Sequence, residues 1–153
     1  MSKRREILKG LGLVAAASVA ATVARAQTDP SKEHRLVIQV SDNNPALMTL
    51  ALNNAANVSA VYAAKGEDVT IEVVAYGPGL HMLRADTSPI KERVEDFPKS
   101  MPNFIFSACA NTIQNMEKTE GKSFALIGKP NIVDAGVVRL MELQEQGWSY
   151  IKV

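Results

Sequence analysis

The strongest indication of the fold lies at residues 35–45, which read RLVIQVSDNNP. The first seven residues are mostly apolar and rich in β-branched side chains, a composition typical of a strand buried on both faces. Asn44 and Pro45 then have the residue types that favour the N-cap and the first turn of an α-helix. The run therefore predicts a buried strand that leads through a short turn into a helix, the opening of a strand–helix–strand unit.

The same alternation continues to the last residue. Further strands are predicted at VTIEVVAY (69–76), NFIFSA (103–108), NIV (131–133) and, at a sheet edge, WSYIKV (148–153). Four helices are expected between these strands. The first is amphipathic and ends at Gly66, and the second begins at Ser88-Pro89 and is closed by Pro98 and Pro102. The third is short, is capped by Asn111-Thr112 and runs through Met116, and the fourth is capped by Asp134 and ends at Gly147. Residues 77–83 are expected to form a loop, and 122–128 fit either a loop or a helix.

This order predicts a single α/β domain over residues 35–153, with an open, mainly parallel five-stranded sheet and helices on both faces. In such sheets, ligands bind in the crevice outside the carboxyl ends of the strands. We therefore expect any functional site to be built from the segments that follow strands: 41–44, 76–82 and 109–112.

Residues 1–26 have the features of an export signal. A basic run with the pair Arg4-Arg5 precedes an uncharged stretch, residues 10–24, and Ala24-Arg25-Ala26 forms a small-x-small cleavage site before Gln27. The uncharged stretch is shorter than the ~20 residues needed to span a bilayer. The segment resembles a twin-arginine translocation signal. We expect a periplasmic protein with no membrane anchor after cleavage near Ala26, and with residues 27–34 as a flexible leader.

Charge and composition exclude several classes of function. The full chain has 17 Lys and Arg residues and 16 Asp and Glu residues. Residues 1–26 contain five of the basic residues and one of the acidic residues. Residues 27–153 therefore have 12 basic and 15 acidic residues, a net charge of −3. A mildly acidic body with 5% aromatic residues argues against a nucleic-acid partner. One cysteine excludes an internal disulfide and a cysteine-based zinc site, and His34 and His81 lack metal-ligand spacing, so neither a metal nor a cofactor is predicted.

Cys109 is the leading candidate for a catalytic residue. It lies between a strand end and a predicted helix N-terminus, where backbone N–H groups and the helix dipole stabilise a thiolate, the reactive form of cysteine. The alternative is that Cys109 fills space in the core, because free cysteine is among the most buried residue types.

The loops at the same edge supply candidate binding residues. These are Asn43, Tyr76, Gly77, His81 and Asn111. His81 has the residue type that exchanges protons near neutral pH, and it fits either a partner of the thiolate or a solvated loop histidine.

Three segments in this order resemble the DsrE/DsrF-like family: VAYGPGL (74–80), FSACANT (106–112) and AGVVRLMELQEQGWSYI (135–151). The resemblance covers nearly all of residues 35–153. It implies a flavodoxin-like layout, assembly as homotrimers or homohexamers, and, in members linked to sulfur oxidation or tRNA thiolation, a cysteine that accepts and passes on sulfur as a persulfide. Cys109 corresponds to that cysteine.

The expected function is therefore that of a periplasmic sulfur carrier. Cys109 would take sulfane sulfur from a donor protein or small thiol and pass it to an acceptor. Two alternatives stay open from the sequence: a non-catalytic ligand-binding or assembly subunit in which Cys109 is structural, and a redox sensor that forms an intermolecular disulfide.

Overall fold

The structure is a computed structural model that describes residues 33–153, so the predicted signal and most of the predicted leader lie outside the described residues. Its centre is a five-stranded sheet in which every pairing is parallel. The strands follow the order β4-β3-β2-β1-β5, with bounds β1 His34–Val40, β2 Val69–Ala75, β3 Phe104–Cys109, β4 Asn131–Val133 and β5 Ser149–Lys152. The last predicted strand, β5, is an edge strand, as expected.

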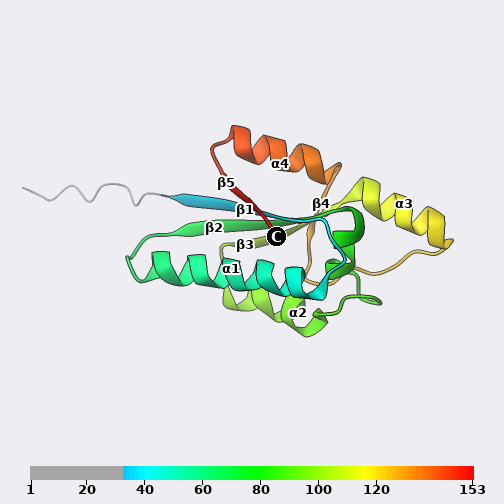
Figure 1. Cartoon of the computed structure of the whole chain (residues 1–153), viewed down its shortest axis with the longest axis horizontal. Coiled ribbons are helices and arrows are strands. Elements are labelled where there is room, and N and C mark those ends of the chain that lie inside the picture. The colour runs from blue at the N-terminus through cyan, green and yellow to red at the C-terminus, as the bar shows by residue number, and fades with distance from the viewer. Residues whose placement is uncertain (1–32) are drawn as a thin grey trace, which may run out of the picture.

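Helices cover both faces of this sheet, which confirms the predicted α/β class (Figure 1). Their bounds are α1 Pro45–Ala63, a 3₁₀ helix η1 Gly77–Leu83, α2 Lys91–Ser100, α3 Ala110–Glu120 and α4 Gly136–Glu145. α1 and α2 lie on one face and α4 on the other, while α3 extends beyond the carboxyl ends of the strands (Figure 1). No helix between residues 33 and 153 is long and apolar enough to cross a membrane.

The first helix begins as its sequence predicts. The Asn44 side chain accepts a hydrogen bond from the Ala46 N–H at 2.9 Å, and Pro45 occupies the first helical position. The apolar side of α1 packs on the sheet, but two of its large apolar side chains, Leu50 and Val61, are exposed. Gly66 follows the helix with φ of +71°, the left-handed conformation for which glycine has no steric penalty.

Four local predictions are wrong. Residues 77–83 form η1 rather than a loop, and α3 runs on to Glu120 instead of ending near Met116. α2 begins at Lys91, because the Ser88 hydroxyl donates to the Met82 carbonyl at 2.7 Å and caps no helix. α2 also continues through Pro98. Pro98 has no N–H to donate to the Val94 carbonyl and its ring crowds that carbonyl, but α2 ends two residues later, so only its last turn is affected. The ambiguous segment 122–128 is a loop.

The predicted helix caps at the carboxyl edge of the sheet are also wrong. α3 has Cys109, not Asn111 or Thr112, at its N-cap, and α4 has Ala135 instead of Asp134. Neither cap side chain makes a capping hydrogen bond. The first N–H groups of both helices therefore remain available to other acceptors.

The two faces of the sheet have unequal cores. The face under α1, η1 and α2 has 19 buried apolar residues, whereas the face under α4 has four: Val37, Val74, Leu140 and Leu143. Side chains alternate between faces along a strand, so the buried polar residues Gln39, Glu72 and Ser107 also lie on the α4 face. That face is held by directional polar contacts as well as by apolar packing.

Candidate functional site

Cys109 lies where two helices begin. It is the last residue of β3 and the N-cap of α3, and it pairs across the sheet with Val133, the last residue of β4. α4 starts three residues after Val133, at Gly136. The positive ends of two helix dipoles thus meet at one thiol, an arrangement that favours a negative charge there.

The groups around the sulfur favour the thiolate. Burial raises the pKa of the Cys109 thiol, but a hydrogen bond from the Thr112 side chain lowers it. Backbone N–H groups of Gly136, Thr112 and Asn111 also lower the pKa, and together these donors outweigh burial, so the pKa of Cys109 lies below its ordinary value. The exposed fraction of Cys109 is 5%, which places this activated thiol just beneath the surface.

Thr112 connects the thiol to the segment after β2. Its Oγ1 accepts a hydrogen bond from the Gly77 N–H at 3.0 Å. A hydroxyl can accept and donate at the same time, so the Thr112 hydroxyl hydrogen donates to the Cys109 sulfur. Gly77 has φ of +52°, a left-handed conformation that L side chains rarely adopt, and this conformation accompanies the N–H contact with Thr112.

Gly136 brings the start of α4 onto Tyr76. A Cβ atom at Gly136 would lie 2.8 Å from the Cβ of Tyr76 and 3.0 Å from two of its ring atoms. A larger residue would push the N-terminus of α4 away from the sheet and from Cys109. Glycine at this position therefore allows the Gly136 N–H to reach the thiol.

The predicted binding residues divide into two groups. Asn43, Gly77 and His81 lie together around a cavity of about 400 Å³ that is also lined by Thr112 and so adjoins the thiol's environment. Glu120, at the end of α3, contributes to the same cavity. The His81 Nδ1 is 2.7 Å from the Thr87 Oγ1. His81 is not among the groups that hydrogen-bond Cys109.

Tyr76 and Asn111 lie elsewhere. The Tyr76 hydroxyl accepts from the Gln39 amide at 2.7 Å, on the α4 face of the sheet, and Gln39 in turn accepts from the Tyr150 hydroxyl. The Asn111 side chain is exposed, and its backbone N–H, which favours the thiolate, also donates to the Asp134 carbonyl at 3.2 Å. Neither residue lines the cavity beside His81.

The fold is shared with an archaeal protein. The chain is 29% identical to a protein of unknown function, MTH1491 from Methanobacterium thermoautotrophicum, with a TM-score of 0.66; the match covers 78% of this chain and 99% of that chain. No family model and no curated protein matches. The DsrE/DsrF-like resemblance therefore stays a prediction.

Sequence reasoning missed an ion pair that holds α4. Arg139 of α4 donates to both carboxylate oxygens of Glu72 at 2.8 Å, and the Ser107 hydroxyl donates to one of them at 2.6 Å. Glu72 is fully buried in β2. The sequence did contain an indication of this pair, because the Glu72 carboxylate lies in an apolar, buried strand and a buried carboxylate requires a partner.

A second missed cluster, centred on Arg84, reaches the cavity through Glu120. The Arg84 guanidinium is buried, donates to Asp86 and Glu120, and lies 3.9 Å from the centre of the Phe124 ring. The hydrogen bond from Arg84 holds the pKa of Asp86 at about 2 and lowers the pKa of Glu120. Both carboxylates are thus held ionised. Among residues 33–153 no three His, Cys, Asp or Glu side chains are grouped so that they could hold a metal ion.

Proposed function

We propose that this protein is a periplasmic sulfur carrier that holds sulfane sulfur as a persulfide on Cys109. The observation that supports the proposal is the convergence of the α3 and α4 N-termini on a thiol whose pKa is lowered. A carrier cysteine must be a thiolate when it attacks and a good leaving group when it releases its cargo. The donors around Cys109 favour both states.

The loading step is an exchange with no net redox change. The Cys109 thiolate attacks the outer sulfur of a persulfide, R–S–SH; a Cys109 S–S bond forms, the donor S–S bond breaks, and the donor leaves as R–S⁻. The outer sulfur keeps its proton throughout. In delivery, an acceptor thiolate attacks the same outer sulfur and Cys109 leaves as the thiolate, stabilised again by Thr112 and Gly136.

The cavity beside the thiol suits the donor or acceptor. It has a volume of about 400 Å³ and shares Thr112 with the environment of Cys109. Asn43 and Glu120 offer hydrogen bonds to a polar small thiol, and His81 offers a ring nitrogen. An exposed fraction of 5% for Cys109 favours small donors, such as polysulfide, over a bulky protein persulfide.

We include export and self-association in this proposal. Export is supported by residues 1–26, and conservative Arg4→Lys with Arg5→Lys should retain the protein in the cytoplasm if the signal is of the twin-arginine type.

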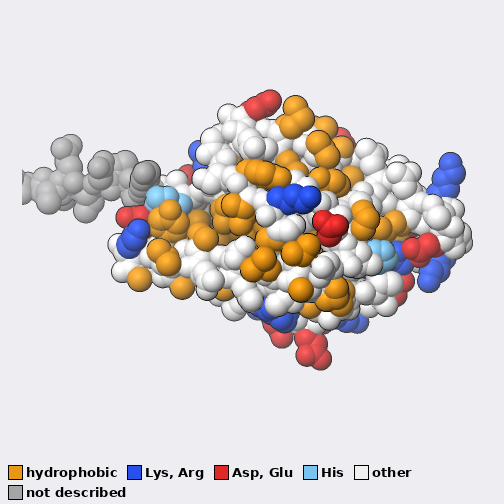
Figure 2. Space-filling model, in the orientation of Figure 1, with side chains coloured by type: hydrophobic (Ala, Val, Ile, Leu, Met, Phe, Trp, Pro, Cys, Tyr) orange, Lys and Arg blue, Asp and Glu red, His pale blue; other side chains and the backbone are white. Residues whose placement is uncertain are grey.

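Self-association is supported by α4, where Val137, Val138 and Met141 are 50–54% exposed; Figure 2 shows apolar side chains gathered over this helix. Met141→Glu, which places a charge on this apolar surface, should lower the mass of the assembly measured by sedimentation.

The test is the intact mass of the protein after incubation with polysulfide, beside Cys109→Ser. We expect a gain of about 32 Da per sulfur atom on the wild type, removed by a reductant and absent from the variant. A second incubation with a small thiol should return the original mass and yield the thiol's persulfide. An equal gain on Cys109→Ser would refute the assignment.

Burial of Cys109 favours one competing function, a binding or assembly subunit in which the thiol is structural. Two results would establish it: no mass gain with polysulfide, and a thiol that iodoacetamide modifies only after the protein unfolds. Binding of a ligand in the 400 Å³ cavity would then survive replacement of Cys109 by Ser.

A further inference from the structure

The strand that ends in Cys109 has one open edge. β4 pairs with β3 only at Ser107–Cys109, so in the described part of the chain the first half of β3, residues 104–106, has a neighbouring strand only on its β2 side. An unpaired strand edge is a template for an additional strand, and proteins usually block or cover such edges.

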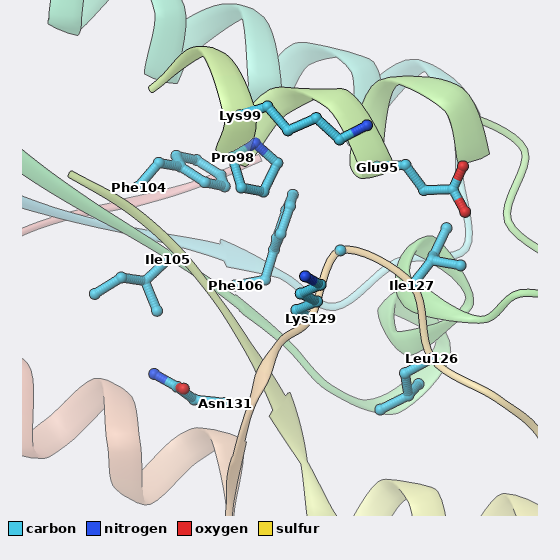
Figure 3. A pocket seen from close by; sticks show the side chains of 11 residues that line it. Glu95, Pro98, Lys99, Phe104, Ile105, Phe106, Leu126, Ile127, Lys129 and Asn131 are labelled. Atoms are coloured by element: carbon cyan, nitrogen blue, oxygen red, sulfur yellow. The ribbon is translucent and has the colours of Figure 1, made fainter. Parts of the chain in front are cut away.

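A cavity of about 680 Å³ surrounds this open edge (Figure 3). It is lined by Phe104 and Phe106, which pack in the core under α1 and α2, and also by Ile105, which points to the opposite face of the sheet. Figure 3 shows Phe106 and Pro98 on one side of the strand and Ile105 and Asn131 on the other. A cavity that contacts residues from both faces lies at the edge itself.

The backbone of β3 offers hydrogen bonds to this space. The Asn103 carbonyl accepts from the Ile71 N–H at 2.9 Å, on the β2 side. Since alternate residues of a strand direct their backbone groups to the same side, those of Phe104 and Phe106 face the open side. The Phe104 N–H donates to the Met101 carbonyl at 3.2 Å. The Phe104 carbonyl and the Phe106 N–H are thus directed at the cavity, whereas the Phe106 carbonyl lies within the pairing of β3 with β4, which begins at Ser107–Asn131.

Two consecutive left-handed residues lie in the segment that leads into β4. Gly128 has φ of +74° and Lys129 has φ of +49°, the one positive value at a non-glycine residue in 33–153. A Cβ at Gly128 would lie 2.8 Å from Val94 and 3.1 Å from Phe106, so the chain packs tightly here before it turns to form β4. Glu95, Lys99 and Lys129 are the charged residues that line the cavity; Lys99 pairs with Asp96, and Lys129 is exposed and takes part in no salt bridge among the described residues.

We propose that an extended peptide segment of a partner protein adds to β3 at Phe104–Phe106 as a short extra strand. Its backbone pairs with Phe106, an apolar side chain enters the cavity beside Phe104 and Pro98, and a carboxylate pairs with Lys129. The directed backbone groups favour a peptide over a purely apolar ligand, and the uncompensated cation favours an acidic residue in it. The site does not use the Cys109 sulfur, so it stands apart from the sulfur-carrier proposal.

The probe is a panel of acetylated, amidated hexapeptides that alternate threonine with an apolar residue (valine, leucine, methionine or phenylalanine) and carry one terminal glutamate. Binding is measured by amide NMR on the Cys109→Ser protein, which removes any thiol reaction. At least one peptide should bind and slow hydrogen exchange of the Phe106 amide by about tenfold or more. A matched peptide N-methylated at alternate amides should give no protection. Failure of every panel member to protect Phe106 overturns the proposal.

Two variants test the contribution of the Lys129 charge and of the cavity, and the N-methylated peptide tests backbone pairing. Lys129→Glu should weaken the glutamate peptide by about twofold to fivefold and strengthen a lysine-ended peptide, because the loss of an exposed ion pair then costs about 0.4–1 kcal/mol. Leu126→Trp, placed to fill the cavity, should abolish binding while its thermal transition stays close to that of the wild type. Equal binding of the N-methylated peptide would instead identify a pocket for apolar ligands.

Discussion

The two faces of the sheet are stabilised in different ways. Under α1 and α2, 19 buried apolar residues form one continuous core. Under α4, four buried apolar residues share the face with Gln39, Glu72 and Ser107, and the helix is fastened by the Glu72–Arg139 pair. Apolar packing tolerates small shifts, whereas a bidentate ion pair fixes an angle and a register. The α4 face needs a defined geometry because it presents Gly136 to Cys109. It is also the face that is held by polar contacts.

The largest effect on stability should come from the α1 face. Leu52 is fully buried in α1, and Leu52→Ala should lower the free energy of unfolding by about 3 to 4 kcal/mol through lost burial and a residual cavity. The pH midpoint for alkylation of Cys109 should not move. Denaturant titration and iodoacetamide kinetics check the two readouts, and a shifted midpoint would show that the two faces are coupled.

Arg139→Met should have a smaller effect on stability and a clear effect on the thiol. It leaves the buried Glu72 carboxylate without its cation, at a cost of about 2 to 3 kcal/mol, reduced because Arg139 is 29% exposed and water can reach the site. With α4 less firmly held, alkylation of Cys109 should shift to higher pH.

The double variant Glu72→Met with Arg139→Met sharpens this test. Most of the lost stability should return, because a packed apolar pair replaces the ion pair, with a remaining cost of about 1 kcal/mol or more for the buried Ser107 hydroxyl that loses its acceptor. If the pair positions Gly136, the alkylation midpoint should remain high despite the recovered stability. Recovery of both would mean that any well-packed α4 serves the thiol equally well.

Thr112→Val removes a single donor from the sulfur. The pKa of Cys109 should rise toward its ordinary value, so alkylation below that pH should slow by roughly fivefold for a lost hydrogen bond of ~1 kcal/mol. Thr112→Ser keeps the hydroxyl and is the matched control. A normal rate in Thr112→Val would place the stabilisation in the backbone N–H groups alone.

The weakest effect should be an acid sensitivity at the Arg84 cluster. Arg84 depresses the pKa of Asp86 from 3.8 to about 2. The stabilisation is therefore complete above pH 4 and is lost as the pH falls toward 2. Asp86→Asn should flatten the fall in denaturation midpoint over this window and leave the midpoint for Cys109 alkylation unchanged. An unaltered slope would assign the acid sensitivity to other carboxylates.

The alternation of elements and the edge that carries Cys109 were predictable because they depend on local signals. A β-branched run, the Asn44-Pro45 start and the order of the strands locate the carboxyl edge of the sheet. The organisation of the site was not predictable in the same way. The Glu72–Arg139 pair joins residues 67 positions apart, and the role of Thr112 depends on a contact with Gly77, 35 positions away. The caps of α3 and α4 were wrong because tertiary contacts, not side-chain capping, set where these helices begin.

The parallel pairing of β1 with β5 has a mechanical consequence. Four residue pairs join the two strands, from Leu36–Ser149 to Gln39–Lys152. The strands run the same way, so a force that pulls the amino end of β1 against the carboxyl end of β5 acts along the ladder. The load is shared by all its hydrogen bonds at once instead of opening them one by one. A force that pulls the two ends of the domain apart is therefore resisted most strongly by the pairing of β1 with β5.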